Sequence, residues 1–155
     1  MKGKAMQIAL SAIGILVVLF LARVIIQGNQ VPELGVQNGK LAAISNKPNN
    51  VSSQTDDPAK KVATLPFKAS QTATLSALKA AVASYGGGKI VTESDDYLYV
   101  VFTTSLMRYR DDVEFWLDAK NQQVHYRSAS RAGYSDLGLN RERYNKLAEL
   151  YRQLP

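Results

Sequence analysis

The sequence predicts an α+β fold, in which a single transmembrane helix precedes a small domain with a roughly four-stranded antiparallel sheet packed against two helices. Three observations support this prediction. An uncharged apolar run lies near the N-terminus, a polar stretch rich in turn-forming residues follows it, and four short β-type runs then lie between two amphipathic segments. We therefore divide the chain into a membrane segment at 1–27, an extended linker or wrapping segment at 28–70, and a domain of order α-β-β-β-β-α at 71–155.

The first element is the apolar run from Met6 to Ile26. Its length of about 20 residues is enough for a helix to cross a hydrocarbon core of about 30 Å. Lys2 and Lys4 precede the run, so the positive-inside rule predicts a cytoplasmic N-terminus. We expect a single-pass protein of the bacterial inner (cytoplasmic) membrane with a periplasmic C-terminal domain. The lipid-facing positions include Ile8, Leu16, Phe20 and, at the interface, Arg23.

A cleaved secretory signal is the alternative interpretation of this run. Its charged start and apolar middle fit a signal, but the run is long for one and no clean Ala-x-Ala site follows it. The chain contains no cysteine, which excludes disulfides, thiolate metal sites, thiol nucleophiles and lipidation of a cysteine. We therefore favour an uncleaved anchor.

Residues 28–70 lack sustained periodicity and are rich in Asn, Ser, Gly, Pro and Asp, as is typical of loops. This segment could hold the domain away from the bilayer, or it could wrap over the surface of the domain. Its predicted docking point on the domain is formed by Leu65, Pro66 and Phe67.

Two amphipathic helices flank the predicted strands. The first spans 72–88 and can be capped by Thr72 or Thr74, and the last runs from Asn140 to Gln153 with Asn140 as its N-cap. Their apolar faces are formed by Leu75, Leu78, Val82 and Tyr85 in the first helix, and by Tyr144, Leu147, Tyr151 and Leu154 in the second.

Four β runs lie between these helices, at 89–93, 97–103, 107–117 and 123–129. The AKNQ turn is an even-length loop, so it pairs Asp118 with Gln123 and sets the register of the last hairpin. This register places Glu114 opposite Arg127, a favourable pair of opposite charges. It also places Asp111 on the apolar face of the sheet, where a carboxylate needs partners. The candidate partners are Ser130, Arg131 and Tyr134.

Three strings of residues connect the chain to a known family: LGVQNGKLAAISNKPNNVSSQ, RYRDDVEFWLD and RSASRAGYSDLGLNRER. From about Leu34 to the C-terminus (34–155), the chain resembles the bacterial and plastid domain-of-unknown-function family 1499. The resemblance implies no activity, because none is assigned to the family. Family members often carry two cysteines around a Pro-Asn element. The matching positions here are Ile44 and Asn50, so a disulfide or metal role of that pair is absent from this chain.

The strongest candidate site is a cluster of polar side chains on the last two strands, the loop after them and the last helix. Arginine binds phosphate or carboxylate through paired hydrogen bonds, and the start of the last helix adds free amide donors. The cluster therefore predicts a site for a small anionic ligand or lipid headgroup. The alternative is a structural network that satisfies the polar groups of the loop itself. Its members are Asp111, Arg127, Ser128, Ser130, Arg131, Tyr134, Asp136, Asn140 and Arg143.

Other chemistry has little support in the sequence. His125 is the only histidine, GYSDLG lacks the spacing of a nucleophile elbow, and GGGK lacks the features of a phosphate loop, so we predict no cofactor and no metal site. Outside the membrane segment the chain is only mildly basic, which predicts no nucleic-acid partner. Two alternatives are equally supported for the rings of Tyr97, Tyr99 and Trp116. They form an exposed aromatic patch that serves as a contact surface, or a helix covers them.

We expect a non-catalytic interaction domain, held by membrane lipid through the anchor. It would bind another membrane or envelope protein, for example as an accessory subunit of a larger membrane complex. Binding of a small anionic ligand or lipid headgroup is the second hypothesis. A hydrolase-like enzyme acting through Asp111 or His125 is the least favoured.

Overall fold

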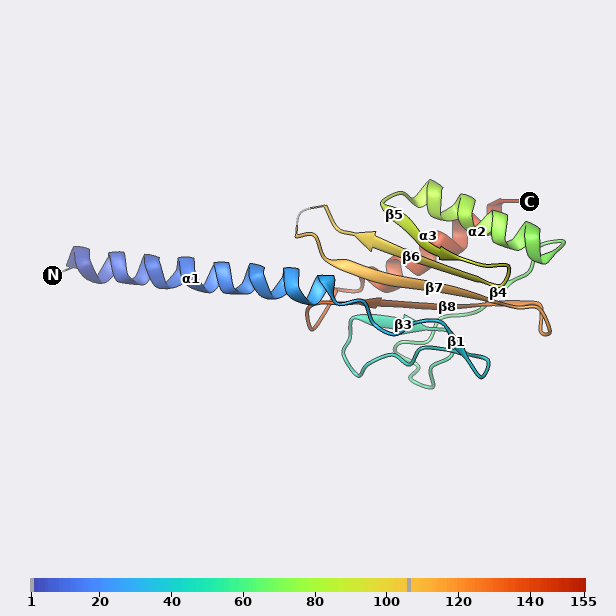
Figure 1. The fold of residues 1–155 in the computed structure, drawn as a ribbon, viewed down its shortest axis with the longest axis horizontal. Helices are drawn as coiled ribbons and strands as arrows, with labels where there is room; N and C mark the ends of the chain where they lie inside the picture. Colours follow the sequence, from blue (N-terminus) through green and yellow to red (C-terminus); the bar gives the residue numbers. More distant parts are fainter. Residues whose placement is uncertain (1, 106) are drawn as a thin grey trace.

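A long helix leads into an α+β domain in this computed structural model, which describes residues 2–105 and 107–155 (Figure 1). The N-terminal helix stands out from the domain along the long axis of the molecule. The elements in chain order are α1 (Lys2–Asn29), β1 (Val36–Gln37), β2 (Lys40–Leu41), β3 (Asn50–Ser52), β4 (Leu65–Pro66), α2 (Gln71–Tyr85), β5 (Gly88–Glu93), β6 (Tyr97–Thr103), β7 (Arg110–Asp118), β8 (Gln123–Ser130) and α3 (Leu139–Gln153).

Helix α1 is long and apolar enough to cross a membrane. Such a helix near the N-terminus is compatible with a single-pass anchor and with a signal sequence. Most of its side chains are exposed, including those of Ile8, Leu16, Phe20 and Arg23. Near its C-terminal end the helix contacts the domain, and Val24 is only 6 % exposed there.

The main sheet has six antiparallel strands in the order β3-β8-β7-β6-β5, with β4 also paired to β8. The predicted register of the last hairpin is confirmed, with Asp118 opposite Gln123 and Glu114 opposite Arg127. The structure has more strands than the roughly four expected. The short strands β3 and β4 complete the hydrogen bonding of β8, which would otherwise be a sheet edge with unpaired backbone groups.

Helices α2 and α3 pack on one face of the sheet and enclose the core (Figure 1). Both predicted apolar faces are confirmed, because Leu78, Val82, Leu147 and Tyr151 are at most 3 % exposed. The predicted docking point before α2 is also confirmed. Leu65 is 1 % exposed, and Phe67 packs against the core.

Three predicted element starts are wrong. The N-cap of α2 is Ser70, whose hydroxyl accepts a hydrogen bond from the amide of Ala73, and it lies two residues before the nearer predicted cap. The N-cap of α3 is Gly138, which has a left-handed backbone, so Asn140 lies inside the helix. Strand β7 begins at Arg110 and not at 107 as predicted, because the φ of Arg108 is +56° and such a backbone interrupts an extended strand.

Residues 30–63, here called the wrapping segment, pair with β8 and cover the part of the other face that β7 and β8 form (Figure 1). Its contacts include a hydrogen bond from the amide of Ser53 to the carbonyl of Tyr126, at 2.8 Å. The exposed aromatic patch is therefore a wrong prediction. Tyr99 is buried, whereas Tyr97 and Trp116 are half-buried. The covering element is this irregular segment and not a helix.

Candidate functional site

Strand β7 carries three carboxylates that are at most 1 % exposed, those of Asp111, Asp112 and Glu114. Alternate residues of a strand point to opposite faces. Asp111 therefore faces the helices, whereas Asp112 and Glu114 face the wrapping segment. Each carboxylate pairs with an arginine, and the three partners in the same order are Arg143, Arg131 and Arg127. The predicted polar cluster is thus divided into two networks, one on each face.

The network on the helix side is enclosed within the core, and Nε of Arg143 is its one guanidinium nitrogen without a partner among the described residues. Arg143 donates to Asp111 Oδ2 at 2.5 Å and to Asn140 Oδ1 at 2.8 Å. The hydroxyl of Ser128 also donates to the Asn140 side chain, whose own amide donates to Asp136 Oδ2 at 2.7 Å. Most of these groups satisfy one another, and the network joins α3 to β7 and β8.

On the opposite face, Arg131 links the sheet to the end of α1. Its Nε and Nη2 donate to Asp112 at 2.8–3.0 Å, and Nη2 also donates to the hydroxyl of Tyr99 at 2.9 Å. The remaining nitrogen, Nη1, donates to the carbonyl of Gly28 at 2.8 Å, and Arg110 reaches the same carbonyl at 3.2 Å. Cationic groups at the C-terminus of a helix satisfy its last carbonyls and favour its dipole. We call this arrangement of Arg110, Arg131 and Gly28 the clasp.

Glu114 and Arg127 form the second pair on this face. Arg127 donates to Glu114 Oε2 at 3.0 Å, while Oε1 accepts from the hydroxyl of Tyr97 at 2.7 Å and the amide of Gly35 at 2.8 Å. Arg127 is only 6 % exposed, yet its Nε has no hydrogen-bond partner within the described residues. A buried donor without a partner costs free energy, and Nε of Arg143 on the helix side is in the same state.

A cavity of about 490 Å³ lies between the wrapping segment and β8, beside the end of α1. Arg127 and Arg131 line it from the sheet, and Lys47 lines it from the wrapping segment. The carboxylates of Asp112 and Glu114 are already engaged by the two arginines, so the lysine brings an unmatched positive charge. The cavity suits an anionic group. Its other polar lining residues are Asp112, which is paired with Arg131, and Gln27, Gln30, Ser45, Asn49 and Ser130.

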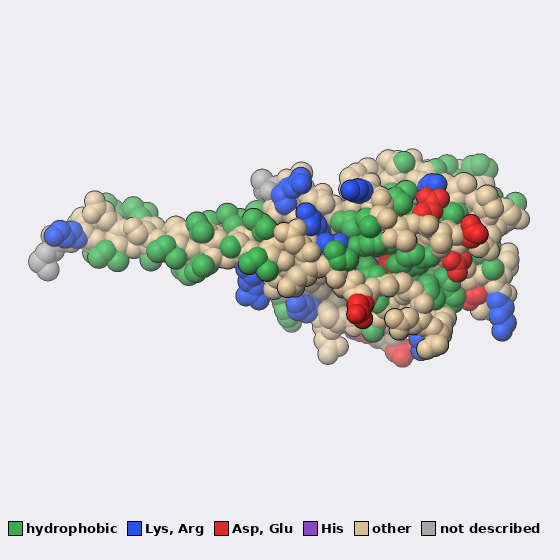
Figure 2. All heavy atoms as spheres, viewed as in Figure 1, with side chains coloured by type: hydrophobic (Ala, Val, Ile, Leu, Met, Phe, Trp, Pro, Cys, Tyr) green, Lys and Arg blue, Asp and Glu red, His purple; other side chains and the backbone are tan. Residues whose placement is uncertain are grey.

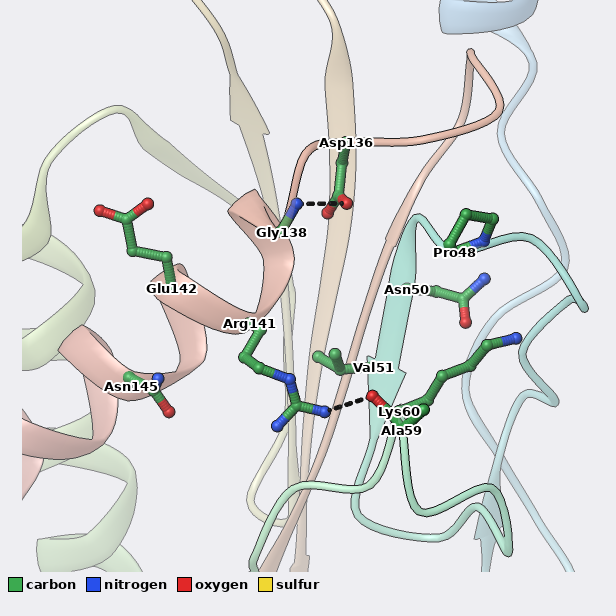
Figure 3. A pocket seen from close by; sticks show the side chains of 10 residues that line it. All are labelled: Pro48, Asn50, Val51, Ala59, Lys60, Asp136, Gly138, Arg141, Glu142 and Asn145. Atoms are coloured by element: carbon green, nitrogen blue, oxygen red, sulfur yellow. Dashed lines mark hydrogen bonds between the residues drawn. The ribbon is translucent and has the colours of Figure 1, made fainter.

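A second cavity, of about 390 Å³, lies where the start of α3 meets the wrapping segment (Figure 3). Figure 3 shows Arg141 directed across it, where the guanidinium donates to the carbonyl of Ala59 at 2.9 Å. The ammonium of Lys60 donates to the carbonyl of Ser45 at 2.9 Å. Both cationic groups hold the wrapping segment in place, which leaves this cavity less suited to an external anion.

The predicted site residues fall in different places. Arg127, Ser130 and Arg131 line the cavity beside α1, and Tyr134 is 72 % exposed on the loop after β8. The predicted burial of Asp111 is confirmed, but its predicted partners are wrong. Arg131 points to the opposite face, and α3 supplies the partner. The helix-side network holds Asp111, Ser128, Asp136, Asn140 and Arg143.

Sequence reasoning missed the residues that face this cavity from the wrapping segment, Lys47 and Asn49, because nothing in a loop sequence predicts which sheet face it covers. It also missed the pairing of Asp112 with Arg131. The alternation of β7 contains a signal for it, since Asp112 and Glu114 share one face and Arg131 continues β8 on the same face. The enzyme hypothesis required one pocket with both Asp111 and His125. These residues lie on opposite faces of the sheet.

Burial and hydrogen bonding fix the protonation of this face. Burial raises the pKa of Tyr99 to about 12, and the hydrogen bond to Asp112 adds to the shift. Burial, followed by the hydrogen bond to Glu114, raises the pKa of Tyr97 further. The hydrogen bond to Asp112 raises the pKa of Arg131. At neutral pH the two tyrosines are therefore neutral donors beside charged arginines.

A protein-family model described as "Protein of unknown function (DUF1499)" matches residues 40–150. The chain belongs to the DUF1499 family. No curated protein and no solved structure matches it. The matched region of this DUF1499 protein contains Lys47, Arg127 and Arg131 of the cavity, and it begins after α1 and the first turns of the wrapping segment.

The DUF1499 region also contains the two positions for which the family resemblance implied cysteines. Asn50 is 4 % exposed, and its amide nitrogen donates to the carbonyls of Ser45 and Lys47 at 3.2 and 3.0 Å. Ile44 lies half-buried in the same loop. In this DUF1499 protein, side-chain hydrogen bonds from Asn50 hold the loop that carries Lys47 into the cavity.

Proposed function

We propose that the protein is a single-pass protein of the bacterial inner membrane that binds an anionic group at the periplasmic surface and performs no catalysis. The observation that carries this proposal is the clasp beside the cavity. Arg131 holds the carbonyl of Gly28 and lines the cavity at the same time. The end of the apolar helix and the candidate binding site thus share one side chain.

The clasp supports an anchor that stays attached. Val24 is buried against the domain, and Arg110 and Arg131 both donate to the last turn of α1. Removal of α1 as a signal sequence would take these acceptors away from two arginines. The lysines before the apolar run support a cytoplasmic N-terminus. Alkaline extraction of membranes, with protease protection of a C-terminal tag in spheroplasts, tests both points.

The cavity beside α1 supports anion binding. Arg127 and Arg131 place guanidinium groups at its wall, and Lys47 adds a charge that no carboxylate of the described residues pairs with. Arginine and lysine together favour phosphate or carboxylate groups. The ligand class is therefore a phosphate- or carboxylate-bearing molecule, either free in the periplasm or part of a lipid headgroup.

Calorimetric titration of the full chain in neutral detergent micelles tests this binding, with inorganic phosphate and short-chain phosphatidylglycerol as separate probes. Lys47→Ala should weaken binding at least several-fold without a change in Tm, because the lysine side chain is exposed. Lys120→Ala, on the exposed turn between β7 and β8, is the matched control and should bind normally. Failure of both probes to bind the unaltered chain would refute the proposed ligand class.

A protein partner is the second candidate function, and strand β5 supports it. This strand forms an edge of the sheet and exposes Ile90 at 36 % and Val91 at 52 %. An exposed edge strand can take up a strand from another membrane or envelope protein, as an accessory subunit would. Crosslinking from Val91 in intact membranes tests this alternative. Purification as a solitary monomer without crosslinks would contradict it.

A further inference from the structure

We propose that the end of the domain around the base of α1 docks on the bilayer itself, with Tyr134 and Leu137 inserted among lipid headgroups. The inference rests on the proposed membrane insertion of α1 but not on the anion cavity. It concerns three neighbouring features: the loop 131–138, the loop that carries Lys47, and the turn before β7. In Figure 1 the loop after β8 and the start of the wrapping segment lie at the end of the domain where α1 joins it.

First, the clasp fixes the position of the domain along α1, and therefore its height above the bilayer. Arg110 and Arg131 hold the carbonyl of Gly28, and Val24 is buried one turn earlier. The helix therefore passes into the domain without a flexible joint. The position of α1 in a membrane then determines where the loops around its base lie.

The second step is that these loops extend back along α1. A cavity of about 320 Å³ is lined by Phe20 and Arg23 on the helix and by Tyr109 and Tyr134 on the loops. Phe20 precedes the clasped Gly28 by about 12 Å along a helix axis, at a rise of about 1.5 Å per residue. An apolar run that ends at Ile26 and spans a core of about 30 Å therefore puts Phe20 at or below the headgroup level. Loop residues beside it must lie in that layer.

The third step is the chemistry of the loops. Tyrosine is enriched at membrane interfaces, and exposed lysine and arginine pair with anionic headgroups. Tyr134 is 72 % exposed, and Lys47 and Arg108 are exposed as well. Figure 2 shows lysine and arginine side chains gathered around the base of α1, where the helix joins the domain.

Leu137 gives the strongest indication that this loop contacts lipid. It is 98 % exposed and has a φ of +56°, a left-handed conformation that costs free energy in a bulky residue. The hydroxyl of Ser135 accepts from its amide at 3.1 Å, and Asp136 accepts from the amide of Gly138 at 3.0 Å, so the turn is held in this form. A strained turn that presents leucine to water is unfavourable. The same turn at a lipid interface buries that side chain.

The absence of cysteine from the chain makes a direct test possible. Full-length single-cysteine variants Leu137→Cys, Leu16→Cys and Lys120→Cys are labelled with an environment-sensitive dye and reconstituted in phosphatidylcholine–phosphatidylglycerol vesicles that contain nitroxide lipids. Leu16 reports insertion of α1, and Lys120 reports the opposite end of the β7–β8 hairpin. We expect quenching and a blue shift at positions 16 and 137 and neither at 120. Tyr134→Cys provides a second reporter on the same loop.

The outcomes separate this inference from the proposed function. Quenching at position 16 without quenching at 137 and 134 overturns the docking but leaves the anchor intact, whereas no quenching at 16 overturns the anchor. A blue shift at 137 that nitroxide lipids do not quench indicates a protein contact and also overturns lipid docking. The charge-reversed pair Lys47→Glu and Arg108→Glu should lower the quenching at 137 in vesicles that contain phosphatidylglycerol. Unchanged quenching in that variant overturns the assigned role of the cations.

Discussion

The two faces of the central sheet both bury carboxylate–arginine pairs, but they use them differently. On the helix side, the pair of Asp111 and Arg143 lies within the core, and the guanidinium also lies 4.9 Å over the ring of Phe102. On the other face, the pairs of Asp112 and Glu114 lie under an irregular segment and border a cavity. Similar ion pairs therefore serve an enclosed network on one face and a partly open one on the other.

This difference indicates where binding is possible. In a network enclosed within the core, removal of one member leaves an uncompensated buried charge. Each face keeps one unpartnered guanidinium nitrogen among the described residues, Nε of Arg143 on one side and Nε of Arg127 on the other. Arg127, however, lines the cavity beside α1, and Arg131 on the same face reaches α1. Substitutions on the two faces should consequently differ in what they disturb, folding stability on one side and the helix junction or ligand binding on the other.

The largest expected effect is on the helix side. Asp111→Asn leaves the guanidinium of Arg143 buried without its counter-charge, and such losses typically cost about 3–5 kcal/mol. Denaturant unfolding of the full chain in micelles, followed by circular dichroism, measures this change. Glu149→Gln is the control, because it breaks an exposed pair with Lys146 and should leave the midpoint unchanged. Equal stability of Asp111→Asn and the parent chain would mean that the helix-side network is not structural.

The next largest effect distinguishes the clasp from the ion pair beneath it. Arg131→Ala removes the partner of buried Asp112 and should cost about 3 kcal/mol, in addition to weakening phosphate binding. Arg110→Ala removes only the contacts with the last turn of α1 and should cost about 1 kcal/mol or less.

Both clasp variants should increase the angular freedom between α1 and the domain. Spin-label distances between position 16 and position 120 in nanodiscs measure this freedom. Distance distributions as narrow as those of the parent chain, in both variants, would show that the clasp does not restrain the helix.

Local patterns predicted the hairpin and helix faces. The register of β7 and β8 follows from a four-residue turn and an alternating pattern, which is why Glu114 and Arg127 could be paired from sequence. The buried state of Asp111 followed from the same register. Its partner did not, because Arg143 lies 32 residues away on a helix whose rotation over the sheet depends on packing.

The wrapping segment shows where sequence reasoning stops. Strands β3 and β4 have three and two residues, too few for a periodic signal. They form because β8 offers unpaired backbone groups, a tertiary property. The predicted N-cap of α2 was wrong for a related reason. Ser70, Thr72 and Thr74 are all acceptable caps by residue type. In the structure Ser70 caps the helix, while the hydroxyl of Thr74 accepts from the amide of Lys68.

A smaller effect is expected on the unfolding stability at alkaline pH, through Tyr99 on the face that borders the cavity. The pKa of Tyr99 is raised from 10.0 to about 12, chiefly by burial and then by Asp112, so the folded state keeps its proton more tightly than the unfolded state. This contribution to stability is complete below pH 10 and is lost as the pH rises towards 12. After allowance for solvent screening near the cavity, it amounts to at most about 2 kcal/mol. Unfolding midpoints between pH 9 and pH 12 measure it, and Tyr99→Phe should flatten the slope. An unchanged slope in that variant would place the titration elsewhere.

The smallest effect concerns His125, on the same face but away from the cavity. Its ring stacks on Trp116 with centroids 4.9 Å apart, and Ser53 Oγ lies 3.3 Å from Nδ1. Burial lowers the pKa of His125, against a weaker opposite effect of Asp118. The unfolded state therefore binds the proton more readily, and this stability is present above the ordinary histidine pKa and is lost on acidification. His125→Asn should reduce the acid sensitivity of the midpoint between pH 7 and pH 5. Ser53 brings the wrapping segment against this ring, so Ser53→Gly should expose the ring and move the NMR-measured pKa of His125 back towards its usual value. A pKa that does not move would show that the contact with Ser53 does not contribute to the burial of His125.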